Sequence, residues 1–211
     1  MTGEAGADHP GTGSPGAGGP GEPPCLVVID MQRVFGEPGS PWLAPRFAEI
    51  VDPVRRLAEA FGPRVVFTRF VAPAVPQGAW RQYYDQWPFA LQPPDAPIYE
   101  LASPFAAMAG PTLDTTTFGK WGPDLAARAG PGPLVLAGVS TDCCVLSTAL
   151  AAADDGIGVR VVADACAGAD DESHANALHI MRLYSPLVDV VTLADVLSEA
   201  APPSPDRPLE S

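Results

Sequence analysis

Positive charge is scarce in this chain. Its 211 residues include 12 lysines and arginines against 25 aspartates and glutamates, and Lys120 is the single lysine. The net charge of -13 argues against electrostatic binding to nucleic acid or to an anionic membrane, because both require clustered positive charge. We therefore expect the binding partner to be a small-molecule substrate, with no nucleic acid and no membrane involved.

Long apolar segments are also missing. No stretch approaches the roughly 20 apolar residues that a membrane-spanning helix needs, and the N-terminus lacks the basic and apolar segments of a signal peptide. We expect a cytoplasmic protein. The four cysteines have neither metal-ligand spacing nor the density of a secreted disulfide scaffold, which favours reduced thiols.

Both ends of the chain lack apolar residues. Residues 1–24 and 200–211 consist largely of Gly, Pro, Ala and polar residues, and such segments cannot bury enough apolar surface to offset the entropy lost on ordering. We therefore predict disordered tails over 1–24 and 200–211. The remaining residues, 25–199, are long enough to bury one sizeable core and are predicted to form a single domain.

Short apolar runs alternate with helical patterns inside this domain. Runs rich in Val, Ile and Leu predict strands, the weakest of them over 113–118, and the full set is 25–29, 64–68, 113–118, 134–137, 159–163 and 187–191. Such continuous apolar content is typical of strands covered on both faces. The alternation predicts an α/β fold, a three-layer α/β/α sandwich around a six-stranded parallel sheet of order 3-2-1-4-5-6. An irregular α+β fold is the alternative.

Helices are predicted between these strands. Apolar residues at helical spacing over 51–61 follow Asp52 and Pro53, which are suitable as the N-cap and the first helical residue. Further helices are predicted over 142–154 and 171–184.

A predicted strand breaks into a helix at two adjacent cysteines. If Thr141 is the N-cap, Cys144 is the third helical residue, and its backbone N–H has no partner within the helix. The partial positive charge at a helix N-terminus favours thiolate over thiol, and the free N–H groups there can hold an oxyanion. We identify Cys144, rather than Cys143, as the candidate nucleophile. The alternative is that both are small apolar fillers of the core.

Sheet topology places a carboxylate near this thiol. The strand over 25–29 ends in Asp30, and the strand over 134–137 ends shortly before Cys144. In the predicted order these two strands are neighbours, and ligands bind beyond the carboxyl ends of such strands. We therefore predict that Asp30 and Cys144 meet in one crevice. The alternative for Asp30 is a cap on the local turn.

An aromatic segment is expected to decide the substrate or an interface. Residues 71–97 contain five aromatic side chains, although aromatic residues make up only 8% of the chain, and a loop of this length is typically a lid or an interface. Trp80, Tyr84 and Trp87 have helical spacing, which predicts a short amphipathic helix serving as a substrate wall or as a dimer contact.

We count five side chains as candidate substrate contacts. Gln32 lies two residues after Asp30, at the same rim of the sheet, although it can equally bond local backbone. Arg69 and Arg81 are able to bind a carboxylate group, but exposed arginines usually have no specific role. The candidate substrate contacts are Gln32, Phe35, Trp80, Tyr84 and Trp87.

The single lysine is a further candidate. Every other basic residue besides the histidines is arginine, and a flexible ammonium can serve where a planar guanidinium cannot, for example as a cation beside a thiolate. The alternative is a surface lysine without a role.

These motifs resemble those of the isochorismatase-like cysteine hydrolases, which include nicotinamidases and N-carbamoylsarcosine amidohydrolases. The resemblance covers roughly residues 25–197. It depends on the segments 28–32 with Phe35, 138–145 with 148–149, and 162–165 followed by His174.

The resemblance implies a catalytic site. It implies a triad of Asp30, Lys120 and Cys144, a cis peptide bond between Val139 and Ser140, and an oxyanion hole formed by backbone N–H groups near Ser140 and Cys144.

Two departures from the family pattern concern the lysine and the metal. The family register places the lysine at Thr115 or Thr116, so either Lys120 reaches the site from the following loop or the triad is incomplete. Nicotinamidases of the family carry an Asp-x-His metal motif after the second strand, where residues 68–73 offer no such ligand. The i,i+5 spacing of His174 and His179 does not place both on one helix face. We therefore expect no metal and no other cofactor.

The predicted activity is hydrolysis of an amide, ureido or lactam C–N bond in a small molecule, through a thioester acyl-enzyme on Cys144. One alternative is a catalytically degenerate binding protein of the same fold. Another is an isochorismatase-type vinyl-ether hydrolase, which uses Asp and Lys without a catalytic cysteine. We expect a homodimer or homotetramer.

Overall fold

The computed structural model describes residues 21–200 and contains one six-stranded sheet. All neighbouring strands are parallel, and their order is β3-β2-β1-β4-β5-β6. This confirms the predicted fold class and strand order. The strands are β1 (Cys25–Ile29), β2 (Val65–Phe70), β3 (Leu113–Thr115), β4 (Leu134–Val139), β5 (Val159–Ala167) and β6 (Val188–Val191).

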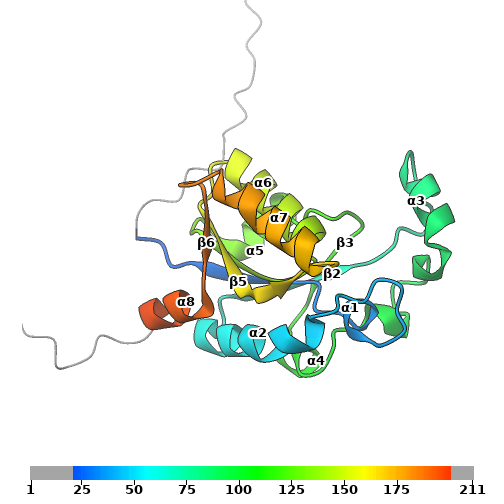
Figure 1. Ribbon diagram of the computed structural model, residues 1–211, viewed down its shortest axis with the longest axis horizontal. Helices are drawn as coiled ribbons and strands as arrows, with labels where there is room; N and C mark the ends of the chain where they lie inside the picture. The colour runs from blue at the N-terminus through cyan, green and yellow to red at the C-terminus, as the bar shows by residue number, and fades with distance from the viewer. Residues whose placement is uncertain (1–20, 201–211) are drawn as a thin grey trace, which may run out of the picture.

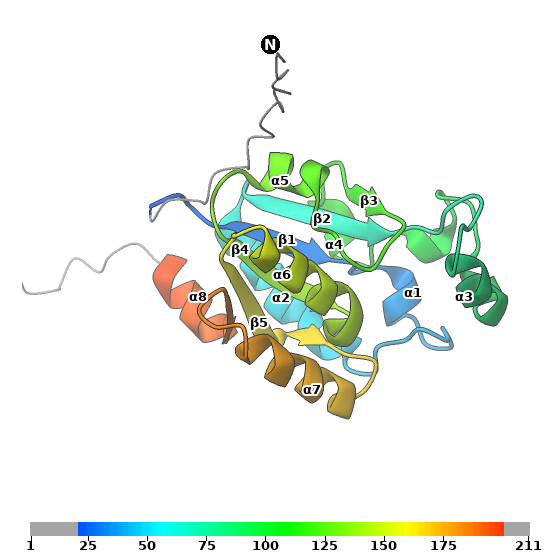
Figure 2. The same ribbon diagram turned by 90° about the horizontal axis from the view of Figure 1, so that it is seen from above.

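Helices cover both faces of the sheet (Figure 1). One face carries α2 (Phe47–Phe61) and α8 (Leu193–Ala200), together with α4 (Phe105–Met108). The other face carries α5 (Pro123–Ala129), α6 (Leu146–Asp154) and α7 (Asp171–Arg182). The short helix α1 (Arg33–Gly36) and helix α3 (Trp80–Gln86) lie beyond the carboxyl ends of β1 and β2 (Figure 2). The remaining turns are η1 (Pro88–Ala90), η2 (Pro97–Tyr99) and the π-helical turn η3 (Thr141–Val145).

The central strands are apolar on both sides because each side faces a helical layer. Every residue of β1 and β4 is buried. Side chains alternate between the faces of a strand, so Leu26 and Val28 belong to the core beneath α2, whereas Val27 and Ile29 belong to the core beneath α6. The two cores together hold the carboxyl ends of β1 and β4 side by side.

Helix α2 begins earlier than predicted, so our assignment of Asp52 and Pro53 to its start is wrong. The helix starts at Phe47, and Pro53 lies in its interior. An interior proline costs about 3 kcal/mol. The buried side chains of Phe47 and Ile50 extend the apolar face by more than a turn, and burying each is worth roughly 1.5–3 kcal/mol, which offsets that cost.

Other sequence predictions concern parts of the chain that the structure describes only partly. The predicted disordered tails, 1–24 and 200–211, lie almost wholly outside the described residues. Within 21–200, no helix has both the length and the apolar character that crossing a membrane requires.

Tyr84 in α3 carries a buried hydroxyl without a partner. Removing this hydroxyl tests how α3 packs. The side chain is 3% exposed, and its hydroxyl makes no hydrogen bond. Leaving such a group unpaired costs about 1–3 kcal/mol. We therefore expect Tyr84→Phe to keep or raise the free energy of unfolding, measured by denaturant titration.

Tyr99 provides the matched control. Its hydroxyl donates to the Ala90 carbonyl and accepts from the Ala72 N–H at 3.2 Å. Tyr99→Phe is therefore expected to lose about 1–3 kcal/mol, because it leaves buried backbone groups unpaired. An equal loss in Tyr84→Phe would contradict the assignment of an unpaired hydroxyl.

Candidate active site

Asp30 ends β1 in a strained backbone conformation that turns the chain at the edge of the sheet. Its φ is +49°, in the left-handed region that residues with a side chain seldom adopt, and the residue is fully buried. The Thr68 hydroxyl donates to Asp30 Oδ1 at 2.7 Å, and the Asp30 N–H donates to the same hydroxyl at 3.2 Å. Strand β2 therefore holds this carboxylate in place.

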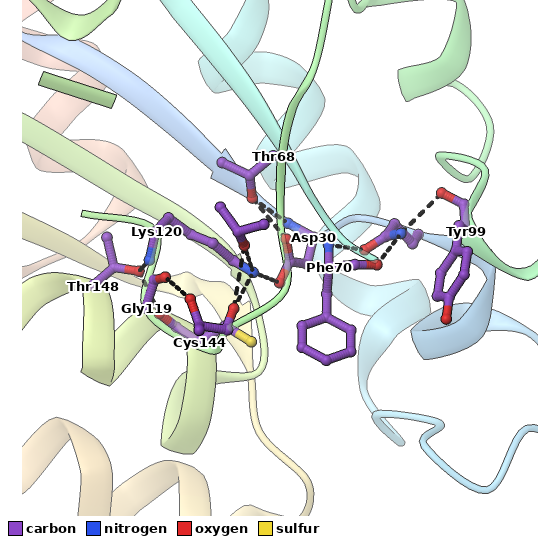
Figure 3. Close-up of polar contacts among 11 residues, drawn as sticks. Asp30, Thr68, Phe70, Tyr99, Gly119, Lys120, Cys144 and Thr148 are labelled. Carbon is purple, nitrogen blue, oxygen red and sulfur yellow. Dashed lines mark hydrogen bonds and ion pairs between the residues drawn. The ribbon is translucent and has the colours of Figure 1, made fainter. Parts of the chain in front are cut away.

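Lys120 reaches Asp30 from the loop that follows β3. Its Nζ lies 2.8 Å from Asp30 Oδ2, and neither side chain is exposed. The ammonium also donates to the Thr115 hydroxyl at 3.0 Å and to the Thr117 carbonyl at 3.1 Å. The sequence left two alternatives, a Lys120 that reaches the site from the loop or an incomplete triad. In the structure the loop turns inward, so that Lys120 lies beside Asp30 (Figure 3).

Thr115 explains how the Lys120 side chain, which comes from a later position in the sequence, fits beside Asp30. The residue ends β3, and it is one of the two positions, with Thr116, at which the resemblance led us to expect the lysine. Because threonine is short, it leaves room for the Lys120 ammonium, which then binds the Thr115 hydroxyl. The ammonium also lies over the Phe70 ring, whose centroid is 5.4 Å from Nζ.

The turn bearing the cysteines lies next to Asp30 because β4 pairs with β1. Gly138 is opposite Ile29 in the ladder, and a Cβ on Gly138 would collide with the Ile29 carbonyl. Its φ of +119° likewise favours glycine. The following peptide bond, between Val139 and Ser140, is cis. The two strand ends thus approach closely enough for their next residues to share one site.

The start of the helical segment differs from our prediction. Ser140, rather than Thr141, is the N-cap, and the segment opens as the π turn η3 before continuing as α6. The Ser140 carbonyl accepts from the N–H groups of Cys143 at 3.1 Å and Val145 at 3.0 Å, but not from that of Cys144. The predicted N-cap, Thr141, instead places its hydroxyl 2.9 Å from Nδ1 of His174.

The surroundings of Cys144 favour the thiol, whereas the helix N-terminus was expected to favour the thiolate. The residue is 3% exposed. Burial raises the pKa of the thiol well above its ordinary value, the negative charge of Asp30 raises it further, and the positive charge of Lys120 only partly opposes them. The sequence predicted that Asp30 and Cys144 meet, but it did not show the burial of the thiol, which is the largest cause of the raised pKa.

This protonation state predicts slow alkylation of the resting protein. Because the thiolate is the reactive form, we expect iodoacetamide to modify Cys144 more slowly at neutral pH than it modifies a free cysteine. The rate should rise as the pH is raised toward the elevated pKa. Peptide mapping after timed labelling measures this, and rapid modification at neutral pH would contradict a raised pKa.

Thr148 connects the loop that carries Lys120 to the turn η3 that carries Cys144. Its hydroxyl accepts from the Lys120 N–H at 2.9 Å and donates to the Cys144 carbonyl at 2.6 Å, and the residue is fully buried (Figure 3). This one side chain on α6 therefore positions the backbones of both residues.

A cavity of about 260 Å³ opens over the thiol. Ser140, Asp142, Cys143 and Cys144 form its polar end, whereas Asp30 and Lys120 lie buried behind Cys144 and are not part of the lining. Its other walls come from several segments, and they are Phe35, Pro41, Trp42, Leu43, Ala44, Phe70, Tyr83, Trp87, Phe118 and Ala169.

Two of the five candidate substrate contacts, Phe35 and Trp87, line this cavity. Gln32 does not, because its amide is fully buried and binds backbone: it donates to the carbonyls of Phe70 at 3.0 Å and Tyr99 at 2.9 Å, and accepts from the Phe70 N–H at 2.8 Å. The other two, Trp80 and Tyr84, are also outside the lining and pack behind it.

Four lining aromatic residues were not among the predicted substrate contacts. Trp42 lies in the loop before α2, Phe118 lies in the loop that carries Lys120, Phe70 ends β2, and Tyr83 occupies the helix position beside the chosen Tyr84. Loop residues have no periodicity that would reveal their direction, so no pattern pointed to the first two. For Tyr83, helical spacing alone did not decide which face of α3 meets the cavity.

No metal-binding group accompanies the site in the part of the chain that the structure describes. Across 21–200, His, Cys, Asp and Glu side chains form no cluster of three or more that could hold an ion. His174 instead packs against the turn, and burial together with the charge of Arg46 lowers its pKa, which favours the neutral ring.

Comparisons with known proteins point to one family. The model of the isochorismatase domain family matches residues 24–195. A cysteine hydrolase from Pseudomonas syringae pv. phaseolicola 1448A has a similar structure, with a TM-score of 0.71, 21% identity, and coverage of 83% of this chain and 91% of that chain. A nicotinamidase from Bacillus subtilis gives a TM-score of 0.65 at 22% identity, covering 79% of this chain and 98% of that one. No curated protein matches the sequence.

Proposed function

The chain belongs to the isochorismatase family, and from this premise we propose that it is a cysteine-dependent hydrolase of a carbonyl C–N bond in a small amide, ureido compound or lactam. The observation that carries the proposal is the buried Asp30–Lys120 pair, with a separation of 2.8 Å, behind a cysteine that lines a cavity. A carboxylate, an ammonium and a thiol in this arrangement can supply a base, a fixed positive charge and a nucleophile.

The proposed reaction begins with proton transfer from the Cys144 thiol to the Asp30 carboxylate as the sulfur attacks the carbonyl carbon. The C–N bond then breaks, the amine leaves with the proton held by Asp30, and a thioester remains on the sulfur. Water attacks the thioester, Asp30 accepts a proton from the water, and the proton returns to the thiolate as the acid departs. Lys120 keeps its charge throughout and balances the negative charge that moves between Asp30 and the sulfur.

Backbone N–H groups of the cysteine turn are the proposed oxyanion donors. Ser140 and Cys144 both line the cavity, and the Ser140 N–H donates to no other group among the described residues. The Ser140 carbonyl accepts from the N–H groups of Cys143 and Val145, on either side of Cys144, but not from the Cys144 N–H. An oxyanion donor of this kind is typically worth about 2.7–4 kcal/mol in the transition state.

Neither alternative function is favoured by a specific observation. A degenerate binding protein was an option because the lysine is shifted in sequence, yet its ammonium lies against Asp30. Vinyl-ether hydrolysis would leave the cysteine at the cavity floor without a role.

The test is to detect the acyl-enzyme. Purified protein is mixed with primary amides, ureido compounds and lactams, quenched at short times, and analysed by intact mass and peptide mapping. We expect at least one class to be hydrolysed, with an acyl adduct on the peptide that contains Cys144 and hydroxamate formed when hydroxylamine is added. Hydrolysis with an adduct elsewhere, or no hydrolysis of any class, would overturn the proposal.

Thr148 offers a test of how the site is held together. Thr148→Val keeps the shape but leaves the Lys120 N–H unpaired, which is expected to cost about 1–3 kcal/mol of stability and to lower kcat more than it raises KM. Thr148→Ser retains the hydroxyl and should restore both. A serine variant as impaired as the valine variant would show that the methyl group, not the hydrogen bonds, matters.

The expected homodimer or homotetramer and the cytoplasmic location stay predictions. Exposed apolar side chains at the C-terminal end of α7, including Leu183 at 71% exposure, support self-association. Light scattering of the purified chain would decide the oligomeric state.

A further inference from the structure

We propose that the substrate carries no anionic group and that it binds through a flat apolar group seated on the aromatic wall of the cavity. This inference depends on the proposed function, because it assigns the chemical class of the molecule whose carbonyl reaches Cys144. It depends on the residues that line the cavity and on the partners that the nearby charged side chains already have.

The wall of the cavity away from its polar end is mostly aromatic, with six aromatic residues among ten. Trp42 is its centre, with ring centroids of neighbours at 5.1–6.1 Å. These neighbours come from segments far apart in sequence, so the wall is assembled by the tertiary fold. The rings that line the cavity are Phe35, Trp42, Phe70, Tyr83, Trp87 and Phe118.

A carboxylate on the substrate would find no cation there. Among residues 21–200, no Arg, Lys or His lines the cavity. Arg69 is paired in a two-pronged contact with Asp114, at 2.9 and 2.5 Å, and Arg81 donates to the Pro76 carbonyl and to Gln77. The ammonium of Lys120 is fully buried against Asp30. An anionic group would therefore lose its hydration without gaining a partner.

The acidic side chain in the lining adds to this argument. Asp142 accepts from the Ser140 hydroxyl at 2.6 Å and from the Ala169 N–H at 2.9 Å, both through Oδ1. Its negative charge would repel an anionic group on the substrate.

The size of the cavity limits the ligand. Its volume of about 260 Å³ lies just below the roughly 300–1,000 Å³ of pockets that bind drug-sized molecules. A single ring bearing an amide suits this space, whereas a peptide or a nucleotide does not. The polar end at Ser140 and Cys144 would receive the amide, and the aromatic wall would receive the ring.

The experiment measures binding separately from turnover. Calorimetry on Cys144→Ala, which retains the cavity but lacks the nucleophile, compares benzamide with its 4-carboxylate derivative. We expect benzamide to bind at least tenfold more tightly than the carboxylate. Equal or tighter binding of the carboxylate, or no binding of benzamide, would overturn the inference.

A pair of tryptophan variants locates the binding. Trp87→Ala, made in the Cys144→Ala background, should weaken benzamide binding at least tenfold, because Trp87 lines the cavity. Trp121→Ala is the matched control, since Trp121 is outside the lining and donates to Asp155. Equal effects of the two variants would contradict the site. If benzamide binds as expected but the unmodified chain hydrolyses no amide, the proposed function fails while the ligand class stands.

Discussion

Cys144→Ala is expected to abolish turnover while leaving the protein folded. If the sulfur forms the acyl-enzyme, no other group in the site can replace it, and loss of a nucleophile lowers kcat on the order of 10⁶-fold in a well-studied serine hydrolase. The fold should be little affected, because alanine fills most of the space of a small buried side chain and removes a thiol from beside the Asp30 charge. Turnover and thermal unfolding, measured on the same preparation, check both parts.

Cys143→Ala is the matched control for this prediction. Cys143 also lines the cavity and precedes Cys144 in the same turn, yet it is not paired with Asp30 in our assignment. We expect Cys143→Ala to retain most of the activity. If Cys144→Ala hydrolyses the substrate at the rate of the unmodified chain, or if Cys143→Ala is the inactive variant, the assignment of the nucleophile is wrong.

The architecture was predictable because the signal for it is local. The continuous Val, Ile and Leu content of β1 and β4 required cover on both faces, and the alternation with helices required a parallel sheet. From strand order alone it followed that Asp30 and Cys144 would approach each other at the carboxyl ends. The start of α2 was missed because a proline is a strong local signal, and here the burial of Phe47 overrides it.

The details of the site were less accessible because they depend on distances between remote segments. That Lys120 reaches Asp30 depends on Thr115 and Thr117 receiving its ammonium, and no spacing rule foretells the direction of such a loop. The raised pKa of Cys144 has the same origin, since it follows from burial of the thiol beside Asp30. Sequence motifs name the chemical groups, whereas tertiary contacts set their charge states.

Lys120→Met is expected to affect both stability and catalysis. Removing the ammonium leaves the Asp30 carboxylate buried without its counter-charge, and breaking a buried ion pair from one side typically costs about 3–5 kcal/mol. Turnover should fall as well, because nothing would then balance the charge that moves between Asp30 and the Cys144 sulfur. Denaturant unfolding and steady-state kinetics measure the two effects.

The double variant Asp30→Asn with Lys120→Met separates these two effects. Asparagine keeps an oxygen that can accept from the Thr68 hydroxyl, and it tolerates the left-handed backbone at this position better than most residues. With both charges gone, most of the lost stability should return, because an uncompensated buried charge is the main cost. Activity should not return, since the base is missing. A double variant that regains turnover, or a Lys120→Met protein as active as the unmodified chain, would show that the pair serves folding alone.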